Sequence, residues 1–275
     1  MGLGTGKTMR MSRIFDRNGN AVIFAPVHNS TSVDPFIGQL DVPAVVTEAA
    51  HAGATAMNLT KGSIRACAPS WISGIGVLHY TFSYTPLGRD PIRQIEVGTV
   101  EESLRLGADG VCMFVGLATE NDDKVVSAIG RIGDECDRHG LVFVCEAEFP
   151  GFYDSMDKSI ETYGLRYLKY TARLCSELGA DIVTSNWPGR AEEFAEIVDY
   201  AKIPVLINGG PQVDESEFLK RLEAAREAGA RGCLVGRNFS EAGHLGKTVR
   251  AACLILREGR AAADVTQELR LGDNV

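Results

Sequence analysis

Helix-like segments and apolar runs alternate along the chain. A helix-like segment ends in Gly-Ala and an apolar run follows at least four times, around Gly53-Ala54, Gly107-Ala108, Gly179-Ala180 and Gly229-Ala230. Glycine just past the last helical turn adopts the left-handed conformation that other side chains resist, so each pair indicates a helix end before a strand. Weaker copies stand at His139-Gly140 and at Lys202-Ile203-Pro204. The pattern predicts alternating helices and strands.

Eight apolar runs are the candidate strands. They cover residues 22–26, 56–60, 76–80, 110–114, 141–146, 181–184, 204–208 and 232–235. Their cores are apolar rather than alternating, as expected for parallel strands that are covered on both faces. Eight such strands in a chain of this size are typical of a (β/α)8 barrel. A doubly wound open sheet remains the alternative, because the number of strands does not show closure.

Length and composition favour one large domain. With 275 residues, 45% of them hydrophobic, the chain can bury a full core, and no linker or change in composition divides it. We therefore expect a single α/β domain over residues 1–275, a (β/α)8 TIM barrel with residues 1–20 as an N-terminal extension and helix. Seven scattered cysteines without a Cys-x-x-Cys pair predict reduced, mostly buried thiols.

Charge and hydropathy exclude several classes of partner. The net charge of -8 provides no basic surface for nucleic acid or for anionic lipid. The longest apolar stretches, such as 251–256, are far shorter than the roughly 18 residues of a membrane span, and the N-terminus has no apolar core of a signal peptide. We expect a cytoplasmic protein with a small-molecule substrate, without nucleic-acid or membrane partners.

The glycine-rich N-terminus resembles a phosphate-binding loop only superficially. Gly6-Lys7-Thr8 ends such a motif, but the glycine required five residues earlier is replaced by Met1, and no strand precedes it. An N-terminal segment that leads into a helix is the better interpretation. We do not expect nucleotide binding there.

Polar residues follow most of the predicted strands. In both candidate folds the site lies at the carboxyl ends of the strands. The residues at those ends are His28, Asn29 and Ser30 after the first strand, Lys61 after the second, His79 and Tyr80 on the third, Glu146 and Glu148 on the fifth, Thr184, Ser185 and Asn186 on the sixth, Asn208, Gly209 and Gly210 on the seventh, and Gly236, Arg237 and Asn238 on the eighth.

The last two strand ends predict a phosphate site. Asn208-Gly209-Gly210-Pro211 follows the seventh strand and Gly236-Arg237-Asn238 follows the eighth. Glycines let backbone N–H groups converge on an oxyanion, and the late loops of such barrels often bind phosphate. Arg237 would add a bidentate charged contact. We assign Thr184 and Asn186 to substrate binding beside this site.

The fifth strand carries the candidate catalytic carboxylates. Glu146 and Glu148 alternate and share one face if the strand is regular. With His28, His79 and Lys61 they could perform acid–base chemistry or hold a divalent cation. A structural ion pair with Lys61 or Arg237 is the competing interpretation. The spacing matches no metal-ligand pattern, so we expect no cofactor and leave a divalent metal as an open alternative.

Other chemically capable side chains are less favourably placed. His51, His139 and His244 fall in helices or at their ends and are interpreted as caps or surface residues. Trp187 and Phe149 could line the pocket. Lys61, and less so Lys158, are the amines positioned to reach a substrate.

Motifs along most of the chain resemble a family of class I aldolases. They include Arg10 to Phe15, Pro26 to Pro35, Lys61-Gly62, Leu178 to Val183, Asn208 to Pro211 and Val235 to Asn238. The chain is similar to archaeal-type fructose-bisphosphate aldolases, to heptulosonate synthases and to the thiolase of a phosphorylated quorum signal. The resemblance implies a (β/α)8 barrel, a phosphorylated keto substrate and a homo-oligomer.

Three catalytic positions of that family are changed in this sequence. The resemblance places a Schiff-base lysine directly after Asp181-Ile182-Val183, where this chain has Thr184. The family's aspartate after the first strand corresponds to the His28-Asn29-Ser30 segment, and its proton-donating tyrosine corresponds to Phe149. A threonine cannot form an imine, so either Glu/His chemistry replaces the covalent step or Lys61 carries the imine.

The sequence therefore predicts an aldolase-like lyase that acts on a small phosphorylated keto compound without the usual lysine. Enolisation by Glu146 or Glu148, with His28 or His79 polarising the carbonyl, is the expected chemistry. A sugar-phosphate isomerase or epimerase using the same residues is one alternative. A non-catalytic phosphosugar-binding paralogue is the other.

Overall fold

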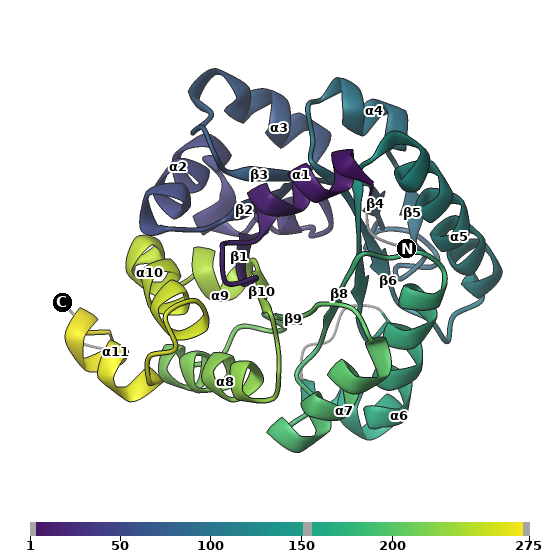
Figure 1. Ribbon diagram of the computed structural model, residues 1–275. Helices are drawn as coiled ribbons and strands as arrows, with labels where there is room; N and C mark the ends of the chain where they lie inside the picture. Colours follow the sequence, from purple (N-terminus) through teal and green to yellow (C-terminus); the bar gives the residue numbers. More distant parts are fainter. Residues whose placement is uncertain (1–3, 151–155, 272–275) are drawn as a thin grey trace.

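Eight parallel strands close into a barrel. The computed structural model describes residues 4–150 and 156–271. The strand order is β1-β10-β9-β8-β7-β6-β3-β2, and β1 pairs with both β10 and β2. This closure confirms the (β/α)8 barrel and excludes the open sheet. Figure 1 shows the strands at the centre and the helices around them.

The barrel strands lie close to the predicted runs. They are β1 (Ala21–Phe24), β2 (Ala56–Leu59), β3 (Gly76–Tyr80), β6 (Gly110–Val115), β7 (Val142–Ala147), β8 (Ile182–Ser185), β9 (Val205–Asn208) and β10 (Gly232–Val235). All their residues are buried. Double-sided burial explains why the strands are apolar rather than alternating in sequence.

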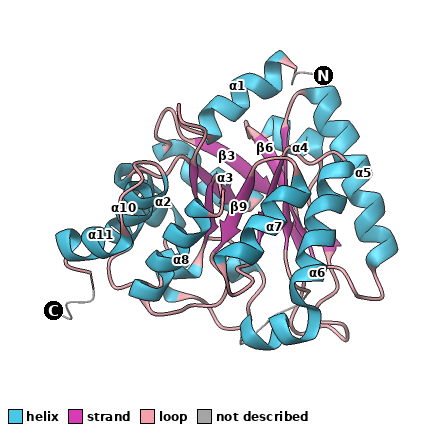
Figure 2. Cartoon of the chain, turned by 60° about the horizontal axis from the view of Figure 1, so that its bottom comes forward, coloured by secondary structure: helices cyan, strands magenta, loops and turns pink. Residues whose placement is uncertain are grey.

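Helices cover the outside of the barrel (Figure 2). They are α2 (Val42–Ala52), α3 (Lys61–Cys67), α4 (Val100–Arg105), α5 (Asp122–His139), α6 (Met156–Glu177), α7 (Ala191–Ala201), α8 (Glu215–Glu227), α9 (Arg237–Ser240), α10 (Leu245–Leu256) and α11 (Ala262–Leu269). Short 3-10 turns lie at His28–Ser30, Ile37–Gln39 and Ala68–Ser70. Gly164, with φ 66° and ψ -177°, interrupts α6.

The Gly-Ala repeat marks helix ends as predicted. Gly53 caps α2 in the left-handed conformation with φ 108°, and its N–H donates to the carbonyls of Ala49 and Ala50. In the weaker copy after α7, Lys202 takes the same conformation with φ 59°. The left-handed cap turns the chain into the next strand in both cases.

The first helix, α1 (Thr5–Ile14), crosses the end of the barrel where the strands begin (Figure 1). Lys7 is only 4% exposed, and its ammonium pairs with Asp137 and, at 2.8 Å, with Asp181 just before β8. Arg13 donates from Nε to Asp109 Oδ1 at 2.6 Å, just before β6. The lysine of the Gly-Lys-Thr segment thus anchors a helix at the barrel bottom, which agrees with the prediction.

Some features had no prediction. β4 (Phe82–Ser83) and β5 (Ile95–Glu96) form a small antiparallel sheet after β3.

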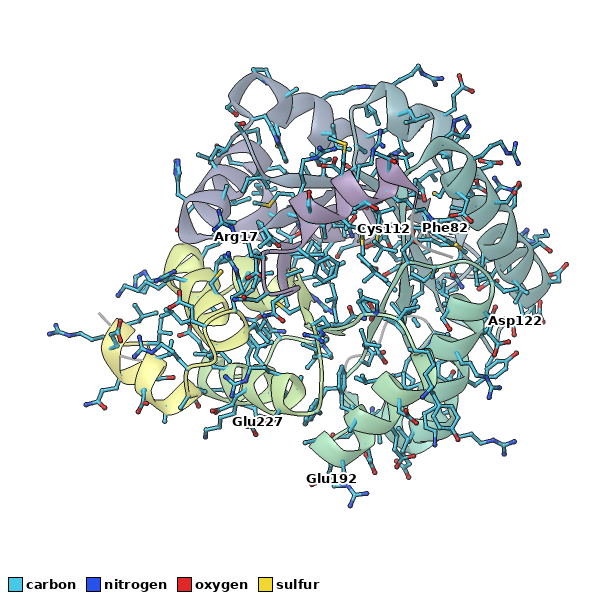
Figure 3. The ribbon with its side chains drawn as sticks, viewed as in Figure 1. Arg17, Phe82, Cys112, Asp122, Glu192 and Glu227 are labelled. Atoms are coloured by element: carbon cyan, nitrogen blue, oxygen red, sulfur yellow. The ribbon has the colours of Figure 1, made fainter. Side chains whose placement is uncertain are left out.

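The seven cysteines are buried and free, as predicted. Among the described residues, no helix combines the length and apolar character of a membrane span. Figure 3 shows Cys112 near the barrel centre, whereas Glu192 and Glu227 lie on the outer helices.

Candidate active site

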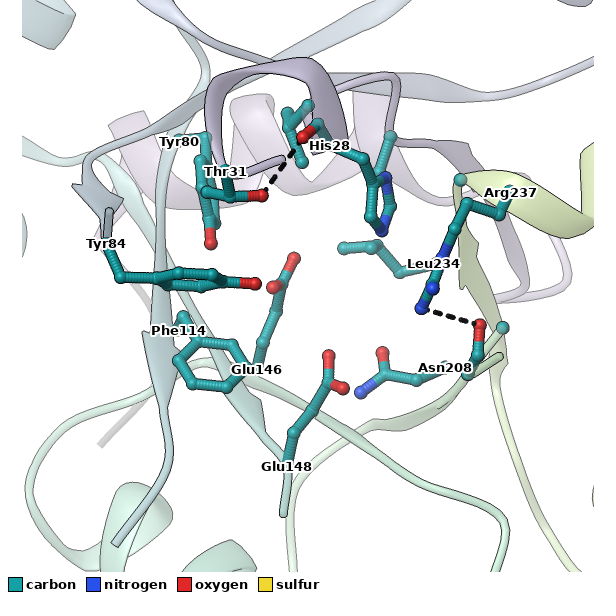
Figure 4. A pocket seen from close by; sticks show the side chains of 15 residues that line it. His28, Thr31, Tyr80, Tyr84, Phe114, Glu146, Glu148, Asn208, Leu234 and Arg237 are labelled. Atoms are coloured by element: carbon teal, nitrogen blue, oxygen red, sulfur yellow. Dashed lines mark hydrogen bonds between the residues drawn. The ribbon is translucent and has the colours of Figure 1, made fainter. Parts of the chain in front are cut away.

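A pocket of about 80 Å³ opens at the carboxyl ends of the barrel strands. Figure 4 shows its walls. The lining residues come from six strands and the loops that follow them. They are Ala25, Val27, His28, Thr31, Tyr80, Tyr84, Phe114, Glu146, Glu148, Asn208, Gly209, Gly210, Leu234, Gly236 and Arg237.

Glu146 projects from β7 into the barrel interior and is only 5% exposed. Its Oε1 accepts hydrogen bonds from Asn58 Nδ2 at 3.0 Å and from the Cys112 thiol at 3.4 Å. Burial, and then the negative charge of Glu148, raise the pKa of Glu146 to about 8. Near neutral pH this carboxyl group is therefore mostly protonated and can donate a proton.

Glu148 lies two residues further along and also lines the pocket. Its backbone continues the ladder, because Glu148 N donates to Val115 O at 3.1 Å. The shared face predicted for the two glutamates is therefore present. Figure 4 shows both carboxyl groups pointing into the same space.

Asn186, directly after β8, holds the Glu148 side chain. Asn186 Nδ2 donates to Glu148 Oε2 at 3.1 Å, while Asn186 Oδ1 accepts from Phe149 N at 2.8 Å. The second bond fixes the orientation of the amide, so its N–H groups must face the carboxylate. The Tyr167 hydroxyl also lies 3.0 Å from the Glu148 carbonyl oxygen. Asn186 was expected to bind substrate, but here it contacts the glutamate and is not part of the pocket wall.

His28 enters the pocket from the turn after β1. Its ring packs on Gly236, where an added Cβ would lie 2.3 Å from His28 Cε1. Burial, and then the positive charge of Arg237, lower the pKa of His28 to about 3. The imidazole is neutral at physiological pH, so it can donate or accept a hydrogen bond without carrying charge.

The β9 and β10 loops form the basic side of the pocket. Arg237 Nη2 donates to the Gly210 carbonyl at 3.2 Å, and the guanidinium lies over the Phe36 ring at 5.8 Å from its centroid. The buried Nε of Arg237 has no hydrogen-bond partner within the described part of the chain. Gly209, Gly210 and Gly236 lie in the wall beside it. The residues predicted to bind phosphate are thus brought together.

Aromatic residues form the opposite side (Figure 4). Burial raises the pKa of Tyr84 to about 12 and that of Tyr80 well above its ordinary value, so both hydroxyls stay protonated. Tyr84 and Phe114 pack with their ring centroids 6.2 Å apart. Tyr84, Thr31 and Phe114 were not proposed as site residues. Tyr84 follows a two-residue strand that leaves almost no sequence signal.

Lys61 and His79 are not brought to the pocket. Lys61 begins α3, and its Nζ contacts Glu102 Oε2 of α4 at 2.8 Å. His79 is fully buried behind β3, where its Nδ1 lies 2.8 Å from Ser103 Oγ. Burial lowers its pKa to about 4. These two residues form a cluster under α4, separate from the two glutamates.

The remaining residues considered in the sequence analysis lie outside the pocket wall. Thr184 is fully buried beside Glu146 in the β7–β8 register but does not line the pocket. Phe149 packs against Tyr163 and Tyr167, and Trp187 stacks on Phe194, so neither lines it. Lys158 is exposed on α6. His51 and His139 lie in the last turns of their helices, and His244 precedes α10, as expected.

The described residues contain no group of three or more His, Cys, Asp or Glu side chains arranged to hold a metal ion. Acid–base chemistry is what the pocket itself provides. A protonated carboxyl group, a second carboxylate and a neutral imidazole surround a space that has one arginine at its edge.

Comparisons with known proteins agree with this fold. Residues 22–241 match the DeoC/LacD family of aldolases. The chain is 32% identical to a 2-amino-3,7-dideoxy-D-threo-hept-6-ulosonate synthase of Archaeoglobus fulgidus, over 91% of each chain. It is 28% identical to an uncharacterized aldolase of Saccharolobus solfataricus, over 97% of this chain and 98% of the relative.

Among solved structures, the chain is similar to archaeal aldolases. An archaeal fructose 1,6-bisphosphate aldolase superposes with a TM-score of 0.81 at 26% identity, covering 92% of this chain and all of the other. Another archaeal aldolase structure, with the catalytic lysine covalently bound to a carbinolamine intermediate, has a TM-score of 0.80 at 26% identity. It covers 91% of this chain and 99% of its own.

Proposed function

The chain belongs to the DeoC/LacD family of aldolases, and from that premise we propose that it makes or breaks a carbon–carbon bond in a small phosphorylated keto compound without an imine intermediate. The observation that carries this proposal is the composition of the pocket. Glu146 and Glu148 stand beside Arg237 and three glycines, and no lysine is among the lining residues of the described chain.

The surroundings of the lysines support a mechanism without a Schiff base. An imine requires an amine that reaches the substrate carbonyl. Lys61 is paired with Glu102 outside the pocket, and Thr184 occupies the buried end of β8. On the resemblance stated above, position 184 is where the family's lysine would stand.

Two carboxyl groups in different surroundings can take different roles, one as the proton acceptor and the other as a hydrogen-bond donor. In the cleavage direction, Glu148 accepts the proton of the substrate hydroxyl, and the carbon–carbon electron pair moves toward the carbonyl to give an enediolate. The aldehyde fragment leaves. Glu148 then returns the proton to carbon, so the protons balance.

Glu146 and His28 stabilise the oxygen that becomes negative during this step. Glu146 carries a proton near neutral pH, and His28 is neutral. Donors that are fixed in a dry site before the reaction stabilise developing charge more effectively than water does. Arg237 would bind the phosphate and hold the carbonyl between the donors.

An isomerase or epimerase is the second candidate. It needs only the proton abstraction and return, and the same carboxyl pair can perform both without breaking a carbon–carbon bond. A non-catalytic phosphosugar-binding protein would use the Arg237 side of the pocket alone.

The test follows exchange of hydrogen for deuterium in dihydroxyacetone phosphate by NMR in D2O. We expect the wild type to catalyse the exchange and Glu148→Gln to slow it by about a hundredfold or more, the usual contribution of a general base. The matched control is Glu227→Gln, at the end of α8 on the outside of the barrel, which should exchange at the wild-type rate.

Two further readouts separate the alternatives. Borohydride reduction in the presence of the ketone should add no mass to the wild type, and an adduct that disappears in Lys61→Ala would contradict the proposal. Addition of an aldehyde should give a new carbon–carbon product. Exchange without such a product across a panel of aldehydes would favour the isomerase, and binding without exchange would favour the silent paralogue.

A further inference from the structure

Glu148 lies one residue beyond the end of β7, where pairing with β8 has stopped. The strand ends at Ala147, which is the last residue paired with β8. On the β6 side one further bond remains, from Glu148 N to Val115 O at 3.1 Å. A general base has to be held within about 0.5 Å of its working position. The function proposed above therefore requires further contacts that hold the backbone of this residue.

The hydroxyl group of Tyr167 on α6 joins the ends of β6 and β7. It accepts from Leu117 N at 2.6 Å and donates to the Glu148 carbonyl oxygen at 3.0 Å. The Leu117 carbonyl oxygen, at 3.2 Å, is the more distant acceptor. Burial raises the pKa of Tyr167 above its ordinary value, so the hydroxyl keeps the proton that it donates. One side chain thus ties the two strand ends together.

The peptide unit between Glu148 and Phe149 is held at both of its polar atoms. Its oxygen accepts from Tyr167, and its N–H, on Phe149, donates to Asn186 Oδ1 at 2.8 Å. The oxygen and the hydrogen lie on opposite edges of a planar unit. Partners on both edges fix the rotation of this plane. With the bond to Val115 O, they set the direction in which the Glu148 side chain leaves the backbone.

The anchor on the β6 side is itself held firmly. Gly116, which precedes Leu117, makes two bonds to the side chain of Gln94. Its carbonyl oxygen accepts from Gln94 Nε2 at 2.6 Å, and its N–H donates to Gln94 Oε1 at 3.3 Å. The Gln94 residue is only 6% exposed. Tyr167 therefore ties Glu148 to a segment that buried hydrogen bonds keep in place.

Aromatic packing holds the Tyr167 ring independently of its hydroxyl group. The ring centroid lies 5.7 Å from that of Phe149 and 5.2 Å from that of Tyr163. Phe149 and Tyr163 also stack on each other, at 5.8 Å. A phenylalanine at position 167 would keep these contacts. The hydroxyl group can therefore be removed without removing the ring.

We propose that Tyr167 is a positioning residue for the reaction, whose hydroxyl group holds the Glu148 backbone so that the carboxylate faces the substrate. Tyr167 is not among the residues of the described chain that line the pocket, so it acts on Glu148 and not on the substrate. The inference rests on the function proposed above and adds to it a residue from an outer helix.

The experiment compares Tyr167→Phe with Tyr170→Phe in the deuterium exchange of dihydroxyacetone phosphate. Tyr167→Phe should lower kcat for exchange about tenfold, because a small displacement of the base slows proton transfer. Its KM should stay within about twofold of the wild-type value, since substrate binding does not involve the hydroxyl group. Tyr170 lies on the same helix and is 49% exposed, so Tyr170→Phe should keep the wild-type kcat and KM.

A double-mutant cycle with Glu148→Gln tests whether the effect passes through the carboxylate. In that background Tyr167→Phe should slow the residual exchange by less than about twofold, because there is no carboxylate left to position. Equal slowing in both backgrounds, an unchanged kcat in Tyr167→Phe, or a rise in KM alone would overturn the inference. The proposed function would stand in each of these cases, since the wild type would still catalyse exchange and Glu148→Gln would still slow it. If the wild type catalysed no exchange, the proposed function would fail, and this inference with it.

Discussion

Replacing Glu146 by glutamine should change how the stability of the protein depends on pH. The amide has the shape of the protonated carboxyl group, and its oxygen can still accept from Asn58 and Cys112. Glutamine, however, does not ionise. The variant therefore isolates the cost of charging residue 146 inside the barrel.

The pKa of Glu146 determines the direction and the size of the change in the free energy of unfolding with pH. Glu146 titrates at about 8 in the folded protein against an ordinary value of 4.5. Between these values the folded protein holds a proton that the unfolded chain has released, so the free energy of unfolding falls as the pH rises. A slope of up to about 1.4 kcal/mol per pH unit gives about 5 kcal/mol over the whole interval, as an order of magnitude.

Urea unfolding of both proteins between about pH 5 and pH 9 measures this difference. Near pH 5 we expect the free energies of unfolding to agree within about 1 kcal/mol, since both side chains are then neutral. Near pH 9 the glutamine variant should be more stable by several kcal/mol. Parallel curves for the two proteins would refute the reasoning, because residue 146 would then carry the same charge in the folded and unfolded states.

Three further variants test the parts of the pocket. Asn186→Ala should lower kcat for deuterium exchange about tenfold, with a KM close to the wild-type value, because Glu148 loses a charged hydrogen bond of about 1.5–3 kcal/mol; a rise in KM alone would contradict a positioning role. Arg237→Met should raise the Kd of dihydroxyacetone phosphate by about tenfold or more and flatten its salt dependence, as measured by calorimetry. Gly236→Ala should cost about 1–3 kcal/mol in urea unfolding and weaken phosphate binding, since the new Cβ would lie 2.3 Å from His28 Cε1; unchanged values of both would mean that the loop adjusts freely.

The barrel could be predicted because the sequence repeats one local rule. Every predicted strand run overlaps an observed strand, since parallel strands buried on both faces are mostly apolar along their length. Glycine caps such as Gly53 mark the helix ends that precede strands. Closure could not be predicted this way, because it depends on the pairing of β1 with both β2 and β10.

The sequence predicted which strand ends carry the site, but not which side chains at those ends face the pocket. His79 and Tyr80 are neighbours on β3, so their side chains point to opposite faces. The sequence did not determine which of them faces inward. The structure places Tyr80 in the pocket wall and His79 against Ser103 of α4. Which of two adjacent strand residues faces the barrel interior thus decides which one lines the pocket and which one has a structural role.

The sequence pattern gave no indication of the hydrogen bonds that join strands distant in sequence. Asn58 looks like an isolated polar residue in an apolar run, yet it donates to Glu146 across the barrel interior. Asn186 looks like a pocket residue at a strand end, yet its amide is committed to Phe149 and Glu148. Spacing along one strand does not reveal such partners, because they depend on the closed barrel.

The residue at position 184 and the charge of Glu146 depend on each other. Thr184 is the register neighbour of Glu146 on the adjacent strand, and neighbouring strands lie about 4.8 Å apart. An ammonium group at that position would stabilise the ionised carboxylate and lower its pKa. With threonine there, burial and the charge of Glu148 act unopposed by a cation from β8, and Glu146 retains its proton. A neutral acid therefore lies in the same layer of the barrel as Thr184, where it can donate a hydrogen bond to the oxygen of an enediolate.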